Sequence, residues 1–174
     1  MAEKKLRVLI MLEDLYEDLE YWYPYHRMRE AGFEVLSVAP KKGSYHGKHG
    51  LPAHSDASAE QIDAGDFDAL IIPGGYSPDR MRRSRAMVDL TRSMFDQGKP
   101  VAAICHGGWM LASAGILEGR KATSFYSIRD DMENAGAEWL DREVVVDDNL
   151  ITSRKPDDLP AFCLAILKKL GERS

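Results

Sequence analysis

Short apolar runs alternate along the chain with segments of helical periodicity, and this alternation limits the fold more than any other pattern. The runs occupy residues 6–11, 33–38, 69–72 and 101–104. Most of their positions are apolar, which is typical of parallel strands covered by helices on both faces. Strands that alternate with helices in this way predict an α/β fold with a mainly parallel sheet.

Helices and hairpins are expected between and after these strands. Apolar residues spaced by three and four predict helices near residues 19–32, 87–98, 108–114, 128–136 and 159–170. A glycine-rich stretch at 41–54 predicts a hairpin or a loop excursion, and a turn at 147–149 predicts a hairpin. The segment 121–124 is expected to add a short strand. Since a domain averages about 150 residues, we expect residues 1–174 to form a single domain.

The composition argues against several classes of protein. The chain of 174 residues has a net charge of −5, so we expect no broad basic surface for nucleic acid. Its apolar runs are shorter than the roughly 18 residues that cross a membrane. Lys4, Lys5 and Arg7 precede an apolar run, but the run ends at Leu12, too early for a signal peptide. We therefore expect a cytoplasmic protein.

Residues with chemical potential follow three of the predicted strands. The first strand leads into an acidic segment that contains Glu17, the third into Gly74 and Gly75, and the fourth into Cys105 and His106. In open α/β sheets, ligands bind beyond the carboxyl ends of the strands. We therefore expect these three segments to converge in space and to form the functional site.

Cys105 is the candidate nucleophile. It directly follows a buried strand and directly precedes a helix, which is the arrangement of a nucleophile elbow, and Gly107 permits a tight turn there. A helix N-terminus lowers the pKa of a thiol, so we expect a reactive thiolate. The alternative is that Cys105 is a small buried apolar residue. Cys163 lies within the apolar stripe of the last helix, and we expect it to be structural.

The positions of the histidines in the sequence exclude several known types of catalytic site. None follows His106, which excludes the residue order of papain-like enzymes, glutamine amidotransferases and α/β-hydrolases. His106 is therefore the candidate partner of Cys105. No cysteine or histidine pair has the spacing of a common metal motif, so no metal is expected.

Glu17 is the candidate acid. Burial and a neighbouring thiolate would raise its pKa, and the protonated carboxyl could donate a hydrogen bond to the thiolate of Cys105. The alternative is that the acidic segment only complements the dipole of the following helix. Gly74 and Gly75 offer backbone N–H groups for an oxyanion, or else they only form a tight turn.

Several segments resemble the PfpI family of the ThiJ/PfpI superfamily, which includes intracellular proteases, protein deglycases and glyoxalase III-like enzymes. They are AICHGG at 103–108, IIPGG at 71–75, YPYHR at 23–27, GKHG at 47–50 and SRKPDDLPAF at 153–162. The resemblance covers almost the whole chain. It implies a flavodoxin-like three-layer α/β/α sandwich, similar to class I glutamine amidotransferases, with Cys105 on the nucleophile elbow.

The resemblance also implies roles for individual residues. Glu17 is placed as the glutamate that contacts the cysteine, and His106 as the histidine that follows the nucleophile. Asp79 matches an acidic residue that approaches this histidine from a neighbouring subunit, although many relatives carry Glu there. Backbone N–H groups of Gly75 and of His106 or Gly107 are implied as oxyanion donors. The family forms dimers, and this branch builds hexamers from them.

The expected function is cysteine-dependent, cofactor-independent chemistry on reactive carbonyls. The Cys105 thiolate would convert methylglyoxal or glyoxal into a 2-hydroxy acid, or would act on glycated proteins in a stress response. One alternative is peptide hydrolysis through an acyl-enzyme. Another is a non-enzymatic redox sensor or chaperone-like stress protein, in which Glu17 accepts a Cys105 oxidised to sulfinic acid.

Overall fold

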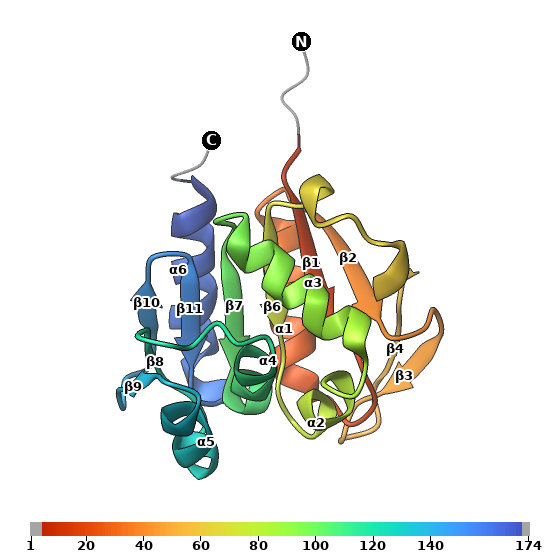
Figure 1. The fold of residues 1–174 in the computed structure, drawn as a ribbon. Coiled ribbons are helices and arrows are strands. Elements are labelled where there is room, and N and C mark those ends of the chain that lie inside the picture. Colours follow the sequence, from red (N-terminus) through yellow and green to blue (C-terminus); the bar gives the residue numbers. More distant parts are fainter. Residues whose placement is uncertain (1–4, 172–174) are drawn as a thin grey trace.

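A seven-stranded sheet forms the centre of the computed structural model, which describes residues 5–171 (Figure 1). The strand order is β10-β11-β7-β6-β1-β2-β5. The strands are β1 (Arg7–Met11), β2 (Glu34–Ala39), β5 (Ala57–Ser58), β6 (Ala69–Ile72), β7 (Val101–Ile104), β10 (Val145–Asp147) and β11 (Leu150–Ser153). Only β10 runs antiparallel to its neighbour, β11, so the predicted mainly parallel sheet is confirmed.

Helices cover both faces of the sheet, as predicted for a three-layer sandwich. On one face lie α3 (Arg85–Asp96) and α4 (Gly108–Ser113), and on the other α1 (Asp18–Glu30) and α6 (Leu159–Gly171) (Figure 1). The central strand β1 is buried on both sides. Leu9 and Met11 belong to one apolar cluster, while Val8 and Ile10 belong to the other, because successive strand side chains point in opposite directions.

Smaller elements surround this framework. They are α2 (Ser77–Met81), α5 (Arg129–Asn134), the antiparallel hairpin of β3 (Ser44–His46) and β4 (Pro52–His54), and the parallel pair of β8 (Lys121–Ala122) and β9 (Glu138–Trp139). Single 3-10 turns occupy Ala59–Gln61, Ala64–Asp66, Cys105–Gly107, Tyr126–Ile128 and Pro156–Asp158. Both predicted hairpins are present. The strand expected at 121–124 is shorter and pairs outside the main sheet.

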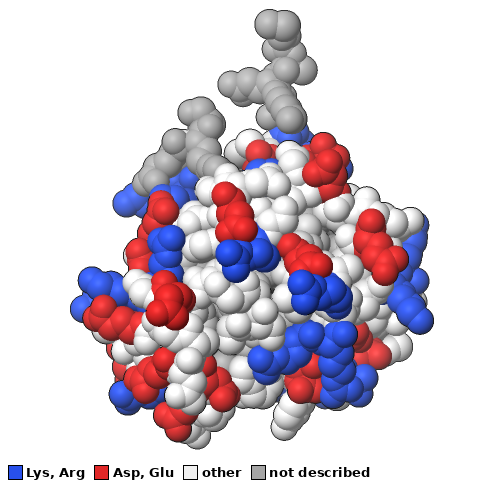
Figure 2. Space-filling model, in the orientation of Figure 1, with Lys and Arg blue, Asp and Glu red and all other residues white. Residues whose placement is uncertain are grey.

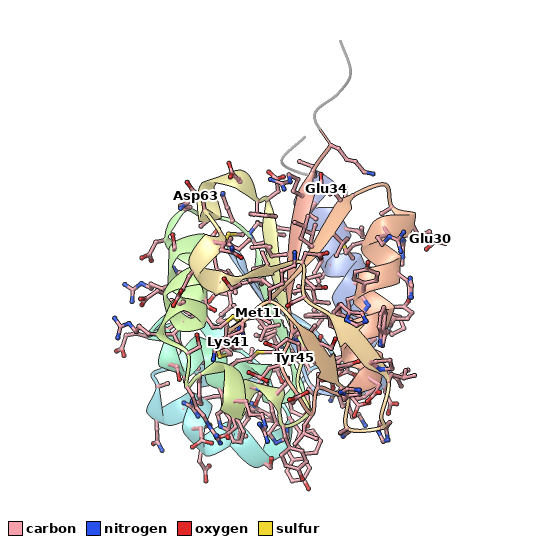
Figure 3. The ribbon with its side chains drawn as sticks, turned by 90° about the vertical axis from the view of Figure 1, so that its right-hand side faces the viewer. Met11, Glu30, Glu34, Lys41, Tyr45 and Asp63 are labelled. Carbon is pink, nitrogen blue, oxygen red and sulfur yellow. The ribbon has the colours of Figure 1, made fainter. Side chains whose placement is uncertain are left out.

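The β3–β4 hairpin packs against the sheet rather than extending into solvent. Tyr45 of β3 is buried, and its hydroxyl donates a hydrogen bond of 2.6 Å to the carbonyl oxygen of Lys41. Figure 3 views the molecule from this edge and labels Tyr45 and Met11, which are buried, and Glu30, which is exposed. The hairpin is therefore a fixed part of the fold, and it positions residues of the site described below.

Charged side chains of both signs are interspersed on the face shown in Figure 2. On α2 and α3, arginines pair with aspartates one turn away, as in the pairs Arg85–Asp89 and Arg92–Asp96, each with a closest contact of 2.9 Å. These arginines are therefore partly neutralised. Among residues 5–171, no helix is both long enough and apolar enough to cross a membrane.

Candidate active site

The strands β7, β6 and β1 are adjacent in the sheet, so the three predicted segments meet at one edge. A cavity of about 330 Å³ opens there. Its lining residues are Glu17, Glu20, Lys48, Gly75, Tyr76, Cys105, His106, Phe125, Ser127 and Pro156. The predicted convergence of the strand ends is therefore found.

Cys105 occupies a strained turn between β7 and α4. Its φ is +60°, a left-handed backbone conformation that residues other than glycine rarely adopt. Gly107 makes the turn possible, since a Cβ atom at this position would lie 2.7 Å from the carbonyl oxygen of Ile72. The predicted elbow is thus present, and it aims the thiol into the cavity.

The Cys105 thiol is 8% exposed, and its surroundings act on its pKa in opposite directions. Burial raises the pKa most, and the Glu20 carboxylate raises it further. Hydrogen bonds from the backbone N–H groups of His106 and Gly75 favour the thiolate and oppose this effect. The net pKa is raised, contrary to the lowering expected from the helix N-terminus, because desolvation outweighs these N–H groups.

Glu20 is the acid that contacts the thiol. It is fully buried on α1, its Oε2 accepts a 2.8 Å hydrogen bond from the backbone N–H of Gly74, and its carboxyl lies beside the Cys105 side chain. Burial, together with the charge of Glu17, raises the pKa of Glu20 to about 8. The carboxyl therefore carries a proton at neutral pH. A protonated Glu20 no longer repels a thiolate, so its proton removes one of the two causes that raise the pKa of Cys105.

Glu17 lies in the same cavity but faces elsewhere. Its Oε2 is 2.6 Å from Nζ of Lys48, and its Oε1 is 3.7 Å from Nε2 of His49. The prediction that Glu17 contacts the Cys105 thiol is wrong, because this contact belongs to Glu20, about one helical turn further along. Glu17 precedes the first turn of α1 with an extended backbone, which directs its side chain towards the β3–β4 hairpin.

Lys48 and His49 reach the site because the tip of the hairpin is fixed to the start of α1. The carboxylate of Asp18 accepts hydrogen bonds from the backbone N–H groups of His49, at 2.9 Å, and Leu51, at 3.1 Å. Glycine suits position 47, because a Cβ atom there would clash with the Asp18 carboxylate that holds the hairpin tip. Lys48 was not identified from the sequence, although it lies within the GKHG segment.

His106 lies against the thiol as predicted. Its Nδ1 is 3.2 Å from Sγ of Cys105, and its Nε2 is 3.2 Å from Oγ of Ser127. The ring stacks on Phe125 and meets the edge of Trp109, each with a centroid distance of 5.1 Å. Burial, and to a lesser degree the charge of Lys48, lowers the pKa of His106. The ring is therefore neutral at pH 7 and able to accept a proton.

Gly74 and Gly75 are required by close packing. A Cβ atom on Gly74 would lie 2.6 Å from Oε2 of Glu20 and 2.8 Å from Cβ of Cys105. Gly75 has a φ of +73°, and its N–H points to the sulfur of Cys105. The Gly74 N–H donates to Glu20, whereas the N–H groups of Gly75 and His106 lie beside the Cys105 sulfur.

Asp79 does not line the cavity in this chain. It lies on α2, its side chain is half-exposed, and it pairs with Arg83 in the turn that follows this helix. Trp109 fills space beside His106, and its Nε1 donates a 2.9 Å hydrogen bond to Asp131. The Trp109 side chain is therefore held in place against the ring of His106.

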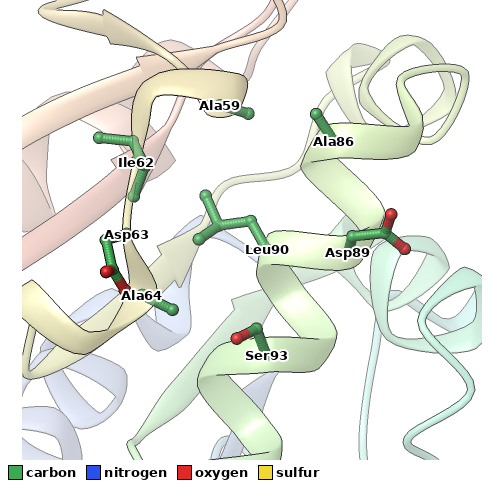
Figure 4. A pocket seen from close by; sticks show the side chains of 8 residues that line it. All are labelled: Ala59, Ile62, Asp63, Ala64, Ala86, Asp89, Leu90 and Ser93. Carbon is green, nitrogen blue, oxygen red and sulfur yellow. The ribbon is translucent and has the colours of Figure 1, made fainter.

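Two other features of the described residues lack the chemistry of an active site. Ligand atoms of Glu17, Asp18 and His49 lie within 4.8 Å of one another, but Lys48 and backbone N–H groups already occupy these carboxylates. A cavity of about 470 Å³ lies between α3 and residues 59–64 (Figure 4). Neither cysteine nor histidine lines it, so it offers no comparable chemistry.

Comparisons with known proteins agree with this arrangement. The model of the DJ-1/PfpI family matches residues 6–169. Deglycase PfpI of Pyrococcus furiosus is 48% identical over 165 residues, which cover 95% of this chain and 99% of the relative. Protein/nucleic acid deglycase 2 of Escherichia coli is 44% identical over 168 residues, which cover 95% and 98%. The crystal structure of Drosophila melanogaster DJ-1beta matches with a TM-score of 0.89 and 30% identity, and covers 96% of this chain and 91% of that chain.

Proposed function

The chain belongs to the DJ-1/PfpI family, and on this basis we propose that it is a deglycase-type enzyme that acts on reactive carbonyls through Cys105. The observation that carries this proposal is the pairing of Cys105 with two proton carriers. Glu20, with a pKa of about 8, lies on one side of the thiol, and His106 lies 3.2 Å away on another. An aldehyde is a strong electrophile, so a thiol flanked by two groups that can transfer protons is sufficient to react with it.

The first step is addition of the Cys105 sulfur to the aldehyde carbon of methylglyoxal. A carbon–sulfur bond forms, the carbonyl oxygen takes the proton of Glu20, and the thiol proton of Cys105 passes to Glu20, which gives a hemithioacetal and leaves Glu20 protonated. In an early glycation adduct the same carbon carries the amine, and there the carbon–nitrogen bond breaks as the carbon–sulfur bond forms, so that the amine leaves with the proton. The N–H groups of Gly75 and His106 lie beside the sulfur and stabilise the developing oxyanion.

The second step moves protons within the hemithioacetal. Neutral His106 removes the proton from the carbon that carries the sulfur, and a proton is returned to the neighbouring carbon. The product is a thioester of a 2-hydroxy acid, in which one carbon is oxidised and the other reduced. Water then hydrolyses the thioester and frees Cys105, so methylglyoxal and one water yield lactate.

The Lys48–Glu17 ion pair forms one wall of the cavity and supports this chemistry electrostatically. Lys48 is the cation nearest to the reacting groups among the lining residues, and it lowers the pKa of His106. Its charge also favours the thiolate of Cys105. Glu17 holds Lys48 in place at 2.6 Å, so we assign Glu17 a role in positioning this ammonium group.

Peptide hydrolysis is the second candidate, because a cysteine hydrogen bonded to a histidine is also the pair that a cysteine peptidase needs. It ranks below carbonyl chemistry since an amide has a poor leaving group that must be protonated.

Asp79 is proposed to complete the site from a second subunit, because within one chain it lies outside the cavity.

The test is release of unmodified peptide from a methylglyoxal-treated peptide. Wild type, Cys105→Ala and the control Cys163→Ala, which alters the buried cysteine of α6, are compared with an excess of an amine that traps free methylglyoxal. Release by wild type and Cys163→Ala, but not by Cys105→Ala, supports direct deglycation. Release that stops when the trap is added limits the enzyme to free carbonyls. A methylglyoxal-treated nucleotide is assayed in the same way, because the Escherichia coli relative is named a protein/nucleic acid deglycase.

A further inference from the structure

The ring of His106 connects the thiol to a hydroxyl group within a single chain. On one side Nδ1 is 3.2 Å from Sγ of Cys105, and on the other Nε2 is 3.2 Å from Oγ of Ser127. Ser127 lies in the 3-10 turn that precedes α5, far from the elbow in sequence. It was not recognised from the sequence, because nothing in a lone serine before a helix points to this contact.

We propose that Ser127 is a positioning residue that holds the imidazole of His106 while the ring exchanges a proton with Cys105. The inference rests on the proposed function, because that function defines the reaction in which the His106 ring moves protons. The hydrogen-bond geometry itself does not depend on which substrate reacts.

A hydroxyl suits this role because it both donates and accepts hydrogen bonds. When the thiol donates to Nδ1, Nε2 carries a hydrogen and donates it to Oγ of Ser127. When Nδ1–H instead donates to the thiolate, Nε2 accepts the hydroxyl hydrogen of Ser127. The protonated ring donates at both nitrogens. Ser127 therefore remains bonded in all three states, whereas a carboxylate such as Asp79 only accepts.

The backbone fixes Ser127 relative to the nucleophile. The N–H of Phe125 donates a 3.2 Å hydrogen bond to the carbonyl oxygen of Cys105, and the N–H of Ile128 donates one of 3.2 Å to Phe125. The Phe125 side chain also stacks on the ring of His106. The turn that carries Ser127 is thus held to the elbow by a backbone hydrogen bond to Cys105 and by the packing of Phe125 on the His106 ring.

The groups around the ring set the sign of the expected change in pKa. Cys105 and Lys48 act on His106 directly, and Glu17 and Glu20 lie elsewhere on the cavity wall. The charged ring gains more from a hydrogen-bond acceptor than the neutral ring does. Loss of the Ser127 hydroxyl should therefore lower the pKa of His106 further.

The experiment compares Ser127→Ala with Ser127→Thr, which keeps the hydroxyl. Ser44→Ala is the matched control, since Ser44 also bonds a histidine, His54, at 2.8 Å on the β3–β4 hairpin. Nuclear magnetic resonance of 15N-histidine-labelled protein gives the pKa of His106, assigned with His106→Asn. Lactate formation from methylglyoxal across pH gives kcat and KM.

For Ser127→Ala we expect kcat to fall about tenfold, with KM nearly unchanged, and the pKa of His106 to fall by about half a pH unit. Ser127→Thr should restore both, and Ser44→Ala should change neither. An unchanged His106 pKa in Ser127→Ala, or equal defects in Ser127→Ala and Ser127→Thr, would overturn the proposal. If wild type forms no lactate, the proposed function fails, while the titration of His106 still tests Ser127.

Discussion

At the scale of single residues, the chemistry depends on the proton that the buried carboxyl of Glu20 holds. Glu20 is fully buried, and its Oε1 has no hydrogen-bond partner among the described residues, while its Oε2 accepts from Gly74. A carboxylate in such a place is costly, so the carboxyl keeps its proton. The same proton makes a neighbouring Cys105 thiolate tolerable and is available to the substrate.

Replacing Glu20 with Gln tests this role, because Gln keeps the shape but cannot transfer a proton. We expect lactate formation by Glu20→Gln to fall about a hundredfold or more, the usual contribution of general acid catalysis. Glu17→Gln is the matched control at the neighbouring carboxyl, and we expect it to lose about tenfold or less. The assignment fails if Glu17→Gln is the more damaging of the two substitutions.

The raised pKa of Glu20 also predicts how stability depends on pH. Its folded pKa of about 8 lies above the ordinary value of 4.5, so the folded state holds the proton more tightly than the unfolded state. This contribution is complete below pH 4.5 and is lost as the pH rises towards 8, at up to about 1.4 kcal/mol per pH unit. Urea unfolding between pH 5 and pH 8 should show this slope in wild type but not in Glu20→Gln. Parallel profiles would contradict it.

At the scale of elements, the site depends on the contact between the start of α1 and the tip of the β3–β4 hairpin. Asp18 is buried and bonds the backbone of His49 and Leu51, while the N–H of Lys48 donates a 2.9 Å hydrogen bond to Tyr16. These bonds bring the Lys48 ammonium to the cavity. The hairpin therefore acts as a fixed support rather than as a loose loop.

Asp18→Ala removes this support. We expect it to lower the free energy of unfolding by about 2 kcal/mol, since two backbone donors lose a charged acceptor, and to lower kcat/KM because Lys48 is no longer held. Asp89→Ala on α3, where the pair with Arg85 is exposed, should cost about 0.5 kcal/mol or less. Urea unfolding and lactate assays measure both. Equal losses in the two variants would show that the hairpin is not fixed by Asp18.

The elements were predictable from the sequence to the extent that their signals are local. The apolar run of β7 followed by Cys105 and two glycines predicted the elbow, and alternation of strands and helices predicted the layers. The choice between Glu17 and Glu20 was not local, because an E-x-x-E spacing places both near one helix face, and only burial against Gly74 separates them. Lys48 and Ser127 reach the site through tertiary contacts that no local pattern encodes.

At the scale of the whole molecule, the position of Asp79 bears on whether one chain carries a complete site. Asp79 is half-exposed on α2 and bonded to Arg83, so it is free to meet a second subunit only if that pair rearranges. In contrast, Cys105, Glu20, His106 and Ser127 already lie together in one chain. The proposal that Asp79 acts in trans therefore makes a sharp prediction about mixtures of variants.

Cys105→Ala supplies Asp79 but no nucleophile, and Asp79→Ala supplies the nucleophile but no Asp79. If the residue acts across subunits, we expect each variant alone to be impaired, Asp79→Ala about tenfold, and mixing after mild dissociation to restore part of the lactate formation. Native mass spectrometry of the mixture, with one variant labelled with 15N, shows whether mixed oligomers form. Mixed oligomers without restored activity, or a fully active monomer, would rule out the role in trans.

The most direct measurement is the time course of lactate formation from methylglyoxal in a buffer free of amines and added thiols. Wild type, Cys105→Ala and Glu20→Gln are compared at equal concentration after each is shown to be folded. The account predicts many turnovers of lactate for wild type, none for Cys105→Ala and a hundredth or less of the wild-type rate for Glu20→Gln. Lactate formation that persists in Cys105→Ala, or its absence from wild type with a thiol that still reacts with alkylating agents, would contradict it.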